Sequence, residues 1–235
     1  MRLYIIRHAD PDYPNNTITE FGHKEAEALG KRLAGEGLDR LYSSPLGRAR
    51  DTMRYTADHM PDRIPAIEDW TIEFSGASTE TEEWGRIAIW DIPGEVIRGQ
   101  EKHPGYDDWQ NLPYVANTPM ASLFADVQSS SDAFFARHGY EREGGRYRCV
   151  APNSERIAVF CHGGFGLAWL AHLLEIPLAL MWSGFWLPPS SVTTIFMEQR
   201  TEQWAIPRCI GMGDVSHLYA AGLPVQPRGI HATNW

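Results

Sequence analysis

Cysteine is scarce in this 235-residue sequence, and its three copies lie far apart, at Cys149, Cys161 and Cys209. An odd number of widely spaced cysteines argues against a disulfide framework and does not fit the spacing of a metal knuckle. We therefore expect a reduced, cytoplasmic setting in which the thiols pack as small hydrophobic groups.

Long apolar runs are also missing, since no stretch reaches the roughly 18–20 residues that cross a bilayer. The short apolar stretch Leu3–Ile6 is cut off by Arg7, His8 and Asp10, so it does not fit the apolar region of a signal peptide. We expect no membrane partner.

Positive charge is in the minority, with 21 Lys and Arg against 30 Asp and Glu and a formal net charge of −9. Such a chain repels nucleic acid at long range, so we expect no nucleic-acid partner. A phosphorylated ligand would have to be held by a local cluster of positive groups. Hydrophobic residues make up 43% of the chain, which is enough for a core that needs no disulfide or metal.

Strand and helix patterns alternate through the first sixty residues. Leu3–Ile6 is typical of a buried strand, Thr19 is suited to cap a helix, Leu38–Tyr42 indicates a second strand and Leu46–Asp58 a second helix. This alternation predicts an α/β fold, a three-layer sandwich with a mostly parallel central sheet flanked by helices. Later in the chain we expect a strand at Ile157–Cys161, a helix at Phe165–Leu174 and a terminal pair of strands at Val192–Met197 and Gln203–Ile206.

The length suits a single domain spanning residues 1–235. The stretch at about 75–153 departs from the alternation and holds one predicted helix, Ser122–Arg137. We expect this stretch to be an insertion that covers one edge of the sheet and roofs the site. The tail is expected to be irregular from about Gly211.

Two histidines directly follow predicted strands, in Arg7-His8 and in His162-Gly163. Ligands of open parallel sheets bind at the carboxyl ends of the strands. Arg48 falls in the first turn of a predicted helix, where backbone N–H groups and the helix dipole favour an anion. Two arginines and two histidines at one edge would form a pocket for a phosphoryl group, because a guanidinium grips two oxygens at once.

Four segments carry a family resemblance: Arg7-His8-Ala9, Ile18-Thr19-Glu20-Phe21-Gly22, Ser43-Ser44-Pro45-Leu46-Gly47-Arg48-Ala49 and Cys161-His162-Gly163-Gly164. In type and order they are similar to the RHG, LTxxG, SSPLxRAxxT and HGG signatures of the histidine phosphatase superfamily. The last Thr of the third signature falls on Thr52. The sequence resembles this superfamily over its first sixty residues and over about 157–175.

The resemblance implies that His8 is the nucleophile and becomes phosphohistidine. Its Nδ1–H would donate to a nearby carbonyl, leaving Nε2 to attack. Arg7, Arg48 and His162 would bind the three equatorial phosphoryl oxygens, with Gly163 beside them. The resemblance implies no metal and no cofactor, because the arginines supply the neutralising charge.

Three further residues have alternative interpretations. Asn16 and Thr17 lie where superfamily members place a polar substrate contact, and they suit a turn equally. Asp10 with His8 and His162 is the starting set for a metal hydrolase, but no further ligand stands at a suitable spacing, and the arginines would repel a cation.

The leaving alkoxide needs a proton, which a carboxylic acid kept neutral by its surroundings can supply. The superfamily places a Glu at the end of the third core strand, and Ile64–Phe74 occupies that place here. We choose Glu73, since apolar neighbours would raise its pKa by desolvation. Four alternatives stay open: Glu68, Asp69, Glu82 and Glu83.

The sequence departs from the superfamily pattern at Ala9, which replaces the usual Gly and requires a φ below zero or some strain. The resemblance as a whole implies a histidine acid phosphatase-type phosphomonoester hydrolase, and we expect it to act on a small phosphorylated metabolite. A phosphoglycerate-type mutase and a non-catalytic phosphate-binding module are the alternatives.

Trp84, Trp90 and Trp109 favour an apolar or ring-bearing leaving group. The oligomeric state stays open, with a homodimer as one alternative.

Overall fold

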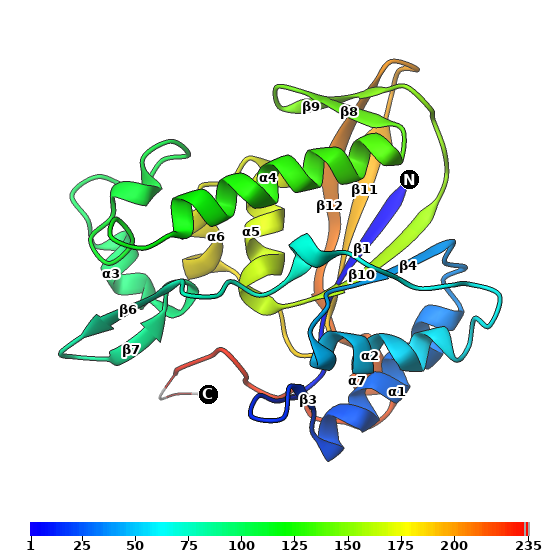
Figure 1. Cartoon of the computed structure of the whole chain (residues 1–235), viewed down its shortest axis with the longest axis horizontal. Coiled ribbons are helices and arrows are strands. Elements are labelled where there is room, and N and C mark those ends of the chain that lie inside the picture. Colours follow the sequence, from blue (N-terminus) through cyan, green and yellow to red (C-terminus); the bar gives the residue numbers. More distant parts are fainter. Residues whose placement is uncertain (233, 235) are drawn as a thin grey trace.

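The structure is a computed structural model that describes residues 1–232 and 234. An eight-stranded sheet lies at its centre, in the strand order β5-β4-β10-β1-β11-β12-β9-β8 (Figure 1). The strands of this sheet are β1 (Arg2–Arg7), β4 (Arg40–Ser43), β5 (Ala66–Ile67), β8 (Tyr140–Glu143), β9 (Arg146–Cys149), β10 (Arg156–Cys161), β11 (Val192–Gln199) and β12 (Trp204–Asp214).

Helices and short hairpins surround the sheet. The helices are α1 (Glu20–Ala34), α2 (Gly47–Ala57), α3 (Gly94–Arg98), α4 (Met120–Arg137), α5 (Gly163–Leu174), α6 (Leu178–Gly184) and α7 (Ser216–Ala220), with single 3-10 turns at η1 (Asp69–Thr71), η2 (Ile89–Asp91) and η3 (Trp109–Asn111). The two separate hairpins are β2 (Pro11–Asp12) with β3 (Thr17–Ile18), and β6 (Ser78–Thr81) with β7 (Gly85–Ala88). None of the described helices has the length and apolar character to span a bilayer.

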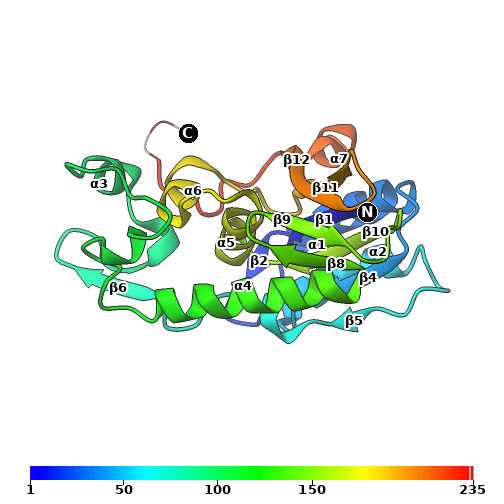
Figure 2. The ribbon, with the colours of Figure 1, turned by 90° about the horizontal axis from the view of Figure 1, so that it is seen from above.

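The side chains of β1 alternate between two hydrophobic cores. Leu3 and Ile5 belong to the core that α4 and α5 complete. Tyr4 and Ile6 belong to a second core, completed by α1 and α2. Successive residues of a strand point to opposite faces, so the sheet is covered on both sides. The predicted α/β sandwich of three layers is confirmed, and Figure 2 shows α4 and α1 on different sides of the strands.

Parallel pairing is confined to one half of the sheet. β5, β4, β10 and β1 pair in parallel, whereas β11, β12, β9 and β8 pair antiparallel. The expectation of a mostly parallel sheet therefore holds for the first half. The other half is antiparallel because β8–β9 and β11–β12 are joined by connections too short for a parallel crossover.

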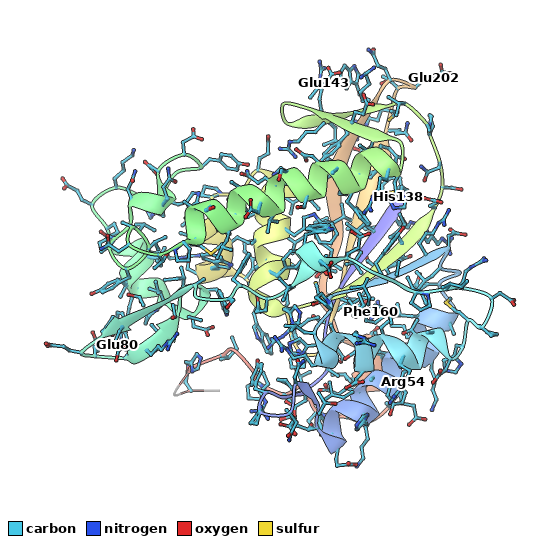
Figure 3. The ribbon with its side chains drawn as sticks, viewed as in Figure 1. Arg54, Glu80, His138, Glu143, Phe160 and Glu202 are labelled. Carbon is cyan, nitrogen blue, oxygen red and sulfur yellow. The ribbon has the colours of Figure 1, made fainter. Side chains whose placement is uncertain are left out.

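The segment expected as one insertion, 75–153, divides into two parts. β8 and β9 extend the main sheet and α4 packs against the larger core, which confirms the helix predicted at Ser122–Arg137. Only the part up to α4, with β6, β7 and α3, forms an arm beside α6 (Figure 1). Figure 3 shows Glu80 at the tip of this arm.

The tail is regular for longer than expected. β12 continues through Gly211 to Asp214, and α7 follows directly. Long antiparallel pairing with β11 extends the strand, and irregular backbone begins only after Ala220. The tail then runs back toward the β2–β3 hairpin (Figure 1).

Candidate active site

Strand register brings the two predicted histidines to the same edge of the sheet. Arg7 of β1 pairs with Cys161 of β10, so His8 and His162 follow a matched pair of residues. Their ring centroids lie 5.2 Å apart. The histidines, 154 positions apart in sequence, therefore share one site.

The His8 side chain is buried and held in one tautomer. Its Nδ1 lies 2.8 Å from the carbonyl oxygen of Ala9. A carbonyl only accepts, so Nδ1 carries the proton and Nε2 has the free lone pair. This confirms the hydrogen bond expected for Nδ1. Ala9 has a negative φ, and its N–H donates to Thr52 Oγ1 over 2.9 Å.

The environment of His8 keeps its ring neutral. Burial lowers the pKa of His8 well below its ordinary value of 6.5, and the charges of Arg7 and Arg48 lower it further. A neutral imidazole is the form that can act as a nucleophile.

His162 has the opposite tautomer. Its Nε2 lies 2.7 Å from Ser44 Oγ. That hydroxyl accepts the N–H of Leu46, and among the described residues His162 Nε2 is the acceptor within hydrogen-bond distance of its own proton. Nδ1 then carries the ring proton of a neutral His162. Burial, followed by the charges of His8, Arg48 and Arg7, lowers the pKa of His162 well below 6.5.

Both predicted arginines are buried beside the histidines. Arg7 Nη1 donates to the carbonyls of Leu187, at 2.6 Å, and of Arg228, at 2.9 Å. Arg48 Nη1 donates to Asn16 Oδ1 over 3.2 Å, and its guanidinium lies 5.4 Å from the ring centre of Tyr13. These contacts fix the direction of each guanidinium.

Three buried donors at this edge have no hydrogen-bond partner among the described residues: Arg7 Nε, Arg48 Nε and His162 Nδ1. A buried donor without a partner costs about 1–3 kcal/mol. An oxyanion with several oxygens would accept from such donors. The arrangement therefore favours binding of a phosphoryl group.

Glu73 lies next to the first turn of α5. Its Oε2 accepts the N–H of Gly164 at 3.1 Å, and its Oε1 accepts that of Phe165 at 2.8 Å. Burial nevertheless raises the pKa of Glu73 above its ordinary 4.5, against these two bonds and against Arg48 and Arg7. The segment before it is not the core strand that we expected. β5 is a two-residue edge strand with both residues exposed, and η1 follows it.

The other four candidate carboxylates lie outside the cavity wall. Glu68 is buried, but its oxygens bind Arg137 at 2.7 Å and the Trp70 ring nitrogen at 2.8 Å. The remaining three, Asp69, Glu82 and Glu83, are exposed.

Asn16 and Thr17, expected as substrate contacts, do not line the cavity. Asn16 adopts a left-handed backbone (φ 51°) and presents its side chain to Arg48. Thr17 Oγ1 instead donates to Asp51. The Asn16 carbonyl leaves no room for a side chain at Gly47, where an added Cβ would lie 2.1 Å from that oxygen. Asn16 thus positions Arg48.

A cavity of about 670 Å³ lies at this edge of the sheet, and His162 is not among its lining residues. Its end at β1, where the buried donors suit a phosphoryl group, is lined by Arg7, His8, Arg48, Glu73 and Gly163. Its other walls come from η2, from α6 with the residues after it, and from the tail: Trp90, Asp91, Trp182, Phe185 and residues 228–231. An added Cβ at Gly164 would lie 2.6 Å from the Trp90 ring, so this glycine allows the aromatic wall to approach α5.

Of the three tryptophans expected near a leaving group, Trp90 lines the cavity. Trp84 instead packs against Tyr114, and Trp109 is buried against Phe124.

Sequence reasoning missed several residues of the site. Tyr13, Asp91 and Arg228 line the cavity, and nothing in their sequence surroundings marked them. Ser44 and Thr52 belonged to a recognised signature, but their contacts with His162 and Ala9 were not anticipated.

Within residues 1–232 and 234, no group of three or more His, Cys, Asp or Glu is placed to hold a metal ion. Asp10, considered above as a metal ligand, binds the Arg228 guanidinium instead, with 2.6 Å between Oδ1 and Nε.

Comparisons with known proteins agree with this geometry. Residues 3–83 match the model of the histidine phosphatase superfamily, branch 1. A search of curated proteins finds no match.

Several solved structures share the fold. A phosphoserine phosphatase from Entamoeba histolytica, solved with 3-phosphoglyceric acid, is 18% identical with a TM-score of 0.62, over 92% of this chain and 98% of that one. A mycobacterial glucosyl-3-phosphoglycerate phosphatase is 16% identical with a TM-score of 0.61, over 90% and 98%. A Bacillus stearothermophilus protein is 20% identical with a TM-score of 0.59, over 92% and 98%.

The family-model match covers the N-terminal third, and the shared fold covers nearly the whole chain. Residues 3–83 therefore resemble the histidine phosphatase superfamily, and the chain as a whole shares the fold of the solved structures named above.

Proposed function

We propose that the protein is a phosphomonoesterase that hydrolyses a small phosphorylated metabolite through a phosphohistidine on His8. One observation carries this proposal: His8, with its Nδ1 bound to Ala9, lines the same cavity as the buried guanidinium groups of Arg7 and Arg48. The lowered pKa of His8 favours its neutral form. This arrangement joins an activated nucleophile to a binding site for phosphoryl oxygens.

In the first half-reaction, His8 Nε2 attacks phosphorus and the bond from phosphorus to the ester oxygen breaks. Arg7, Arg48 and His162 Nδ1–H hold the equatorial oxygens, where charge spreads in a loose transition state. Glu73 gives its proton to the departing alkoxide. Each donor that stabilises the transition state is worth about 3–4 kcal/mol, by analogy with an oxyanion-hole donor.

In the second half-reaction, the ionised Glu73 takes a proton from water, which attacks the phosphorus. The bond from phosphorus to Nε2 breaks, and inorganic phosphate leaves. His8 returns to its starting form, because Nδ1 keeps its proton throughout. The raised pKa of Glu73 suits a group that must act as acid and then as base.

The comparisons support a phosphatase, since two of the structural neighbours are phosphatases by name. The phosphoserine and glucosyl-3-phosphoglycerate that those names specify are small phosphorylated metabolites, the substrate class that we propose here.

The test is hydrolysis of p-nitrophenyl phosphate by the unmodified protein, by His8→Ala and by His59→Ala, which changes an exposed histidine. We expect hydrolysis by the unmodified protein and by His59→Ala, and none above background by His8→Ala. A folded protein with no hydrolysis would favour a phosphate-binding module. Phosphoglycerate isomerisation faster than phosphate release would favour a mutase.

A further inference from the structure

The part of the cavity beyond its end at β1, the proposed phosphate-binding end, is mostly apolar and aromatic. Trp90 and Trp182 lie side by side there, with ring centroids 6.4 Å apart and planes inclined at 58°. Phe185, 43% exposed, adds a third aromatic side chain to the lining. A volume of about 670 Å³ is in the range of pockets that enclose whole small molecules, so this wall faces the alcohol part of a bound ester.

One carboxylate interrupts this wall. Asp91 follows Trp90 directly, is partly buried and lines the cavity. Its carboxylate makes no hydrogen bond with any described residue, in contrast to Glu73. The charges of His231 and Arg7 act on it, but burial is the larger influence and raises its pKa above the ordinary 3.8. Asp91 therefore presents an acceptor to whatever occupies this part of the cavity.

Few other polar side chains are available there. Ser183 Oγ accepts the Nε–H of Arg98 at 3.3 Å, the guanidinium of Arg228 binds Asp10 at 2.6 Å, and the lining residue His231 is exposed. A sugar would bring several hydroxyl groups that need partners, and this wall offers too few. A flat aromatic group could stack on the tryptophans, but it would bury Asp91 without a partner. A positively charged nitrogen with alkyl substituents satisfies both features, since aromatic faces and a carboxylate both attract it.

We propose that the substrate is a phosphomonoester whose alcohol carries a positively charged nitrogen, held between Asp91 and the faces of Trp90 and Trp182. This inference rests on the proposed phosphomonoesterase function and names the substrate class of that site. The phosphate-binding end and the aromatic end meet at α5, where an added Cβ at Gly163 would lie 3.3 Å from Arg7 Nε and one at Gly164 would lie 2.6 Å from the Trp90 ring. One ester can therefore reach both ends.

The test compares choline phosphate with 3,3-dimethylbutyl phosphate, which has the same shape without the charge. We expect kcat/KM for choline phosphate to be at least about tenfold higher than for the uncharged ester. A cation–π contact shielded from water, together with an opposite charge, has an effect of about that size. In Asp91→Asn this ratio should fall toward one. Asp107→Asn, which removes one exposed carboxylate elsewhere, should keep the original ratio.

Glucose 6-phosphate and phenyl phosphate test the two alternative leaving groups, a sugar and an uncharged aromatic ring. Equal kcat/KM for the charged and uncharged esters, or higher values for either of these two, would overturn the inference while leaving the phosphatase intact. If p-nitrophenyl phosphate is not hydrolysed, the proposed function fails. Calorimetric binding of choline phosphate and its isostere then decides the inference separately, and equal dissociation constants would overturn it.

Discussion

Asp10 and Arg228 form an ion pair across 218 positions of sequence, with 2.6 Å between Oδ1 and Nε. The same Arg228 accepts hydrogen bonds at its backbone carbonyl from Arg7 Nη1 and from Trp186 Nε1, at 2.9 and 3.0 Å. The tail is thereby held beside the site, and it aligns Arg7, one of the two arginines proposed to bind phosphate. This gives the C-terminal segment a positioning role.

Arg228→Ala should release the tail and loosen Arg7. We expect kcat/KM for p-nitrophenyl phosphate to fall about 10–100-fold, since small misplacements of a positioning group have effects of that size. Limited proteolysis should cut the variant faster after Ala220. Arg208→Ala, which breaks a surface ion pair with Glu198, is the matched control and should behave like the unmodified protein. Unchanged kinetics in Arg228→Ala would argue against the positioning role.

The Glu73→Gln substitution should slow the cleavage of different phosphate esters to different extents, depending on whether the leaving group needs a proton. Hydrolysis of an alkyl phosphate should slow by about 10²–10⁴-fold, because its alkoxide needs a proton. Formation of the phosphoenzyme from p-nitrophenyl phosphate should slow much less, since that leaving group needs no proton. Glu68→Gln is the control, because Glu68 pairs with Arg137 away from the cavity. A larger loss in Glu68→Gln than in Glu73→Gln would assign the acid to Glu68.

The pH profile follows from the directions of two pKa shifts. His8 must be neutral, and its lowered pKa keeps it so below pH 6.5. Glu73 must be protonated, and its raised pKa keeps it so above pH 4.5. We therefore expect kcat/KM for an alkyl phosphate to be greatest in mildly acidic solution and to fall as Glu73 ionises. The fall should be absent in Glu73→Gln. If kcat/KM of that variant fell with pH in the same way, the decrease would come from the titration of another group, either in the protein or in the substrate.

We expect the ionisation of Glu25 to lower the free energy of unfolding as the pH rises. Its side chain is fully buried behind the site, Oε2 accepts the N–H of Asp10 at 2.6 Å, and burial raises its pKa from 4.5 to about 7. The folded protein then holds a proton that the unfolded chain loses above pH 4.5, so stability falls as pH rises from 4.5 to 7. The shift corresponds to about 3 kcal/mol.

Glu25→Gln should remove this dependence, and urea unfolding of both proteins from pH 5 to 8 measures it. The variant should lose less stability than the unmodified protein over that range. If the free energy of unfolding changed with pH in the same way in both proteins, Glu25 would not be the group that titrates.

Sequence patterns predicted the site where local structure determines it. Arg7, His8, Arg48 and His162 each sit at a strand end or a first helical turn, so their meeting follows from the order of the elements. The tautomer of His8 was implied by the family resemblance, and in the structure it depends on the immediate neighbour Ala9.

Other contacts depend on packing that no local pattern encodes. The family resemblance implied a core strand at Ile64–Phe74, yet Ile64 is 92% exposed at the sheet edge. Arg228 reaches the site from irregular chain, through a carbonyl that any residue would provide. The antiparallel half of the sheet depends on β8 and β9, which lie in the segment where sequence patterns were weakest. Figure 3 shows Glu143 and Glu202 at the turns of the two hairpins of this half.

The most direct test of the central claim is to trap the phosphoenzyme. The protein would be mixed with labelled p-nitrophenyl phosphate, quenched in alkali within milliseconds to seconds, and mapped by mass spectrometry and phosphorus NMR. We predict one acid-labile, alkali-stable phosphoryl group on Nε2 of His8, absent from His8→Ala. Rapid hydrolysis with no label on His8, or label on Nδ1 or on another residue, would contradict the account.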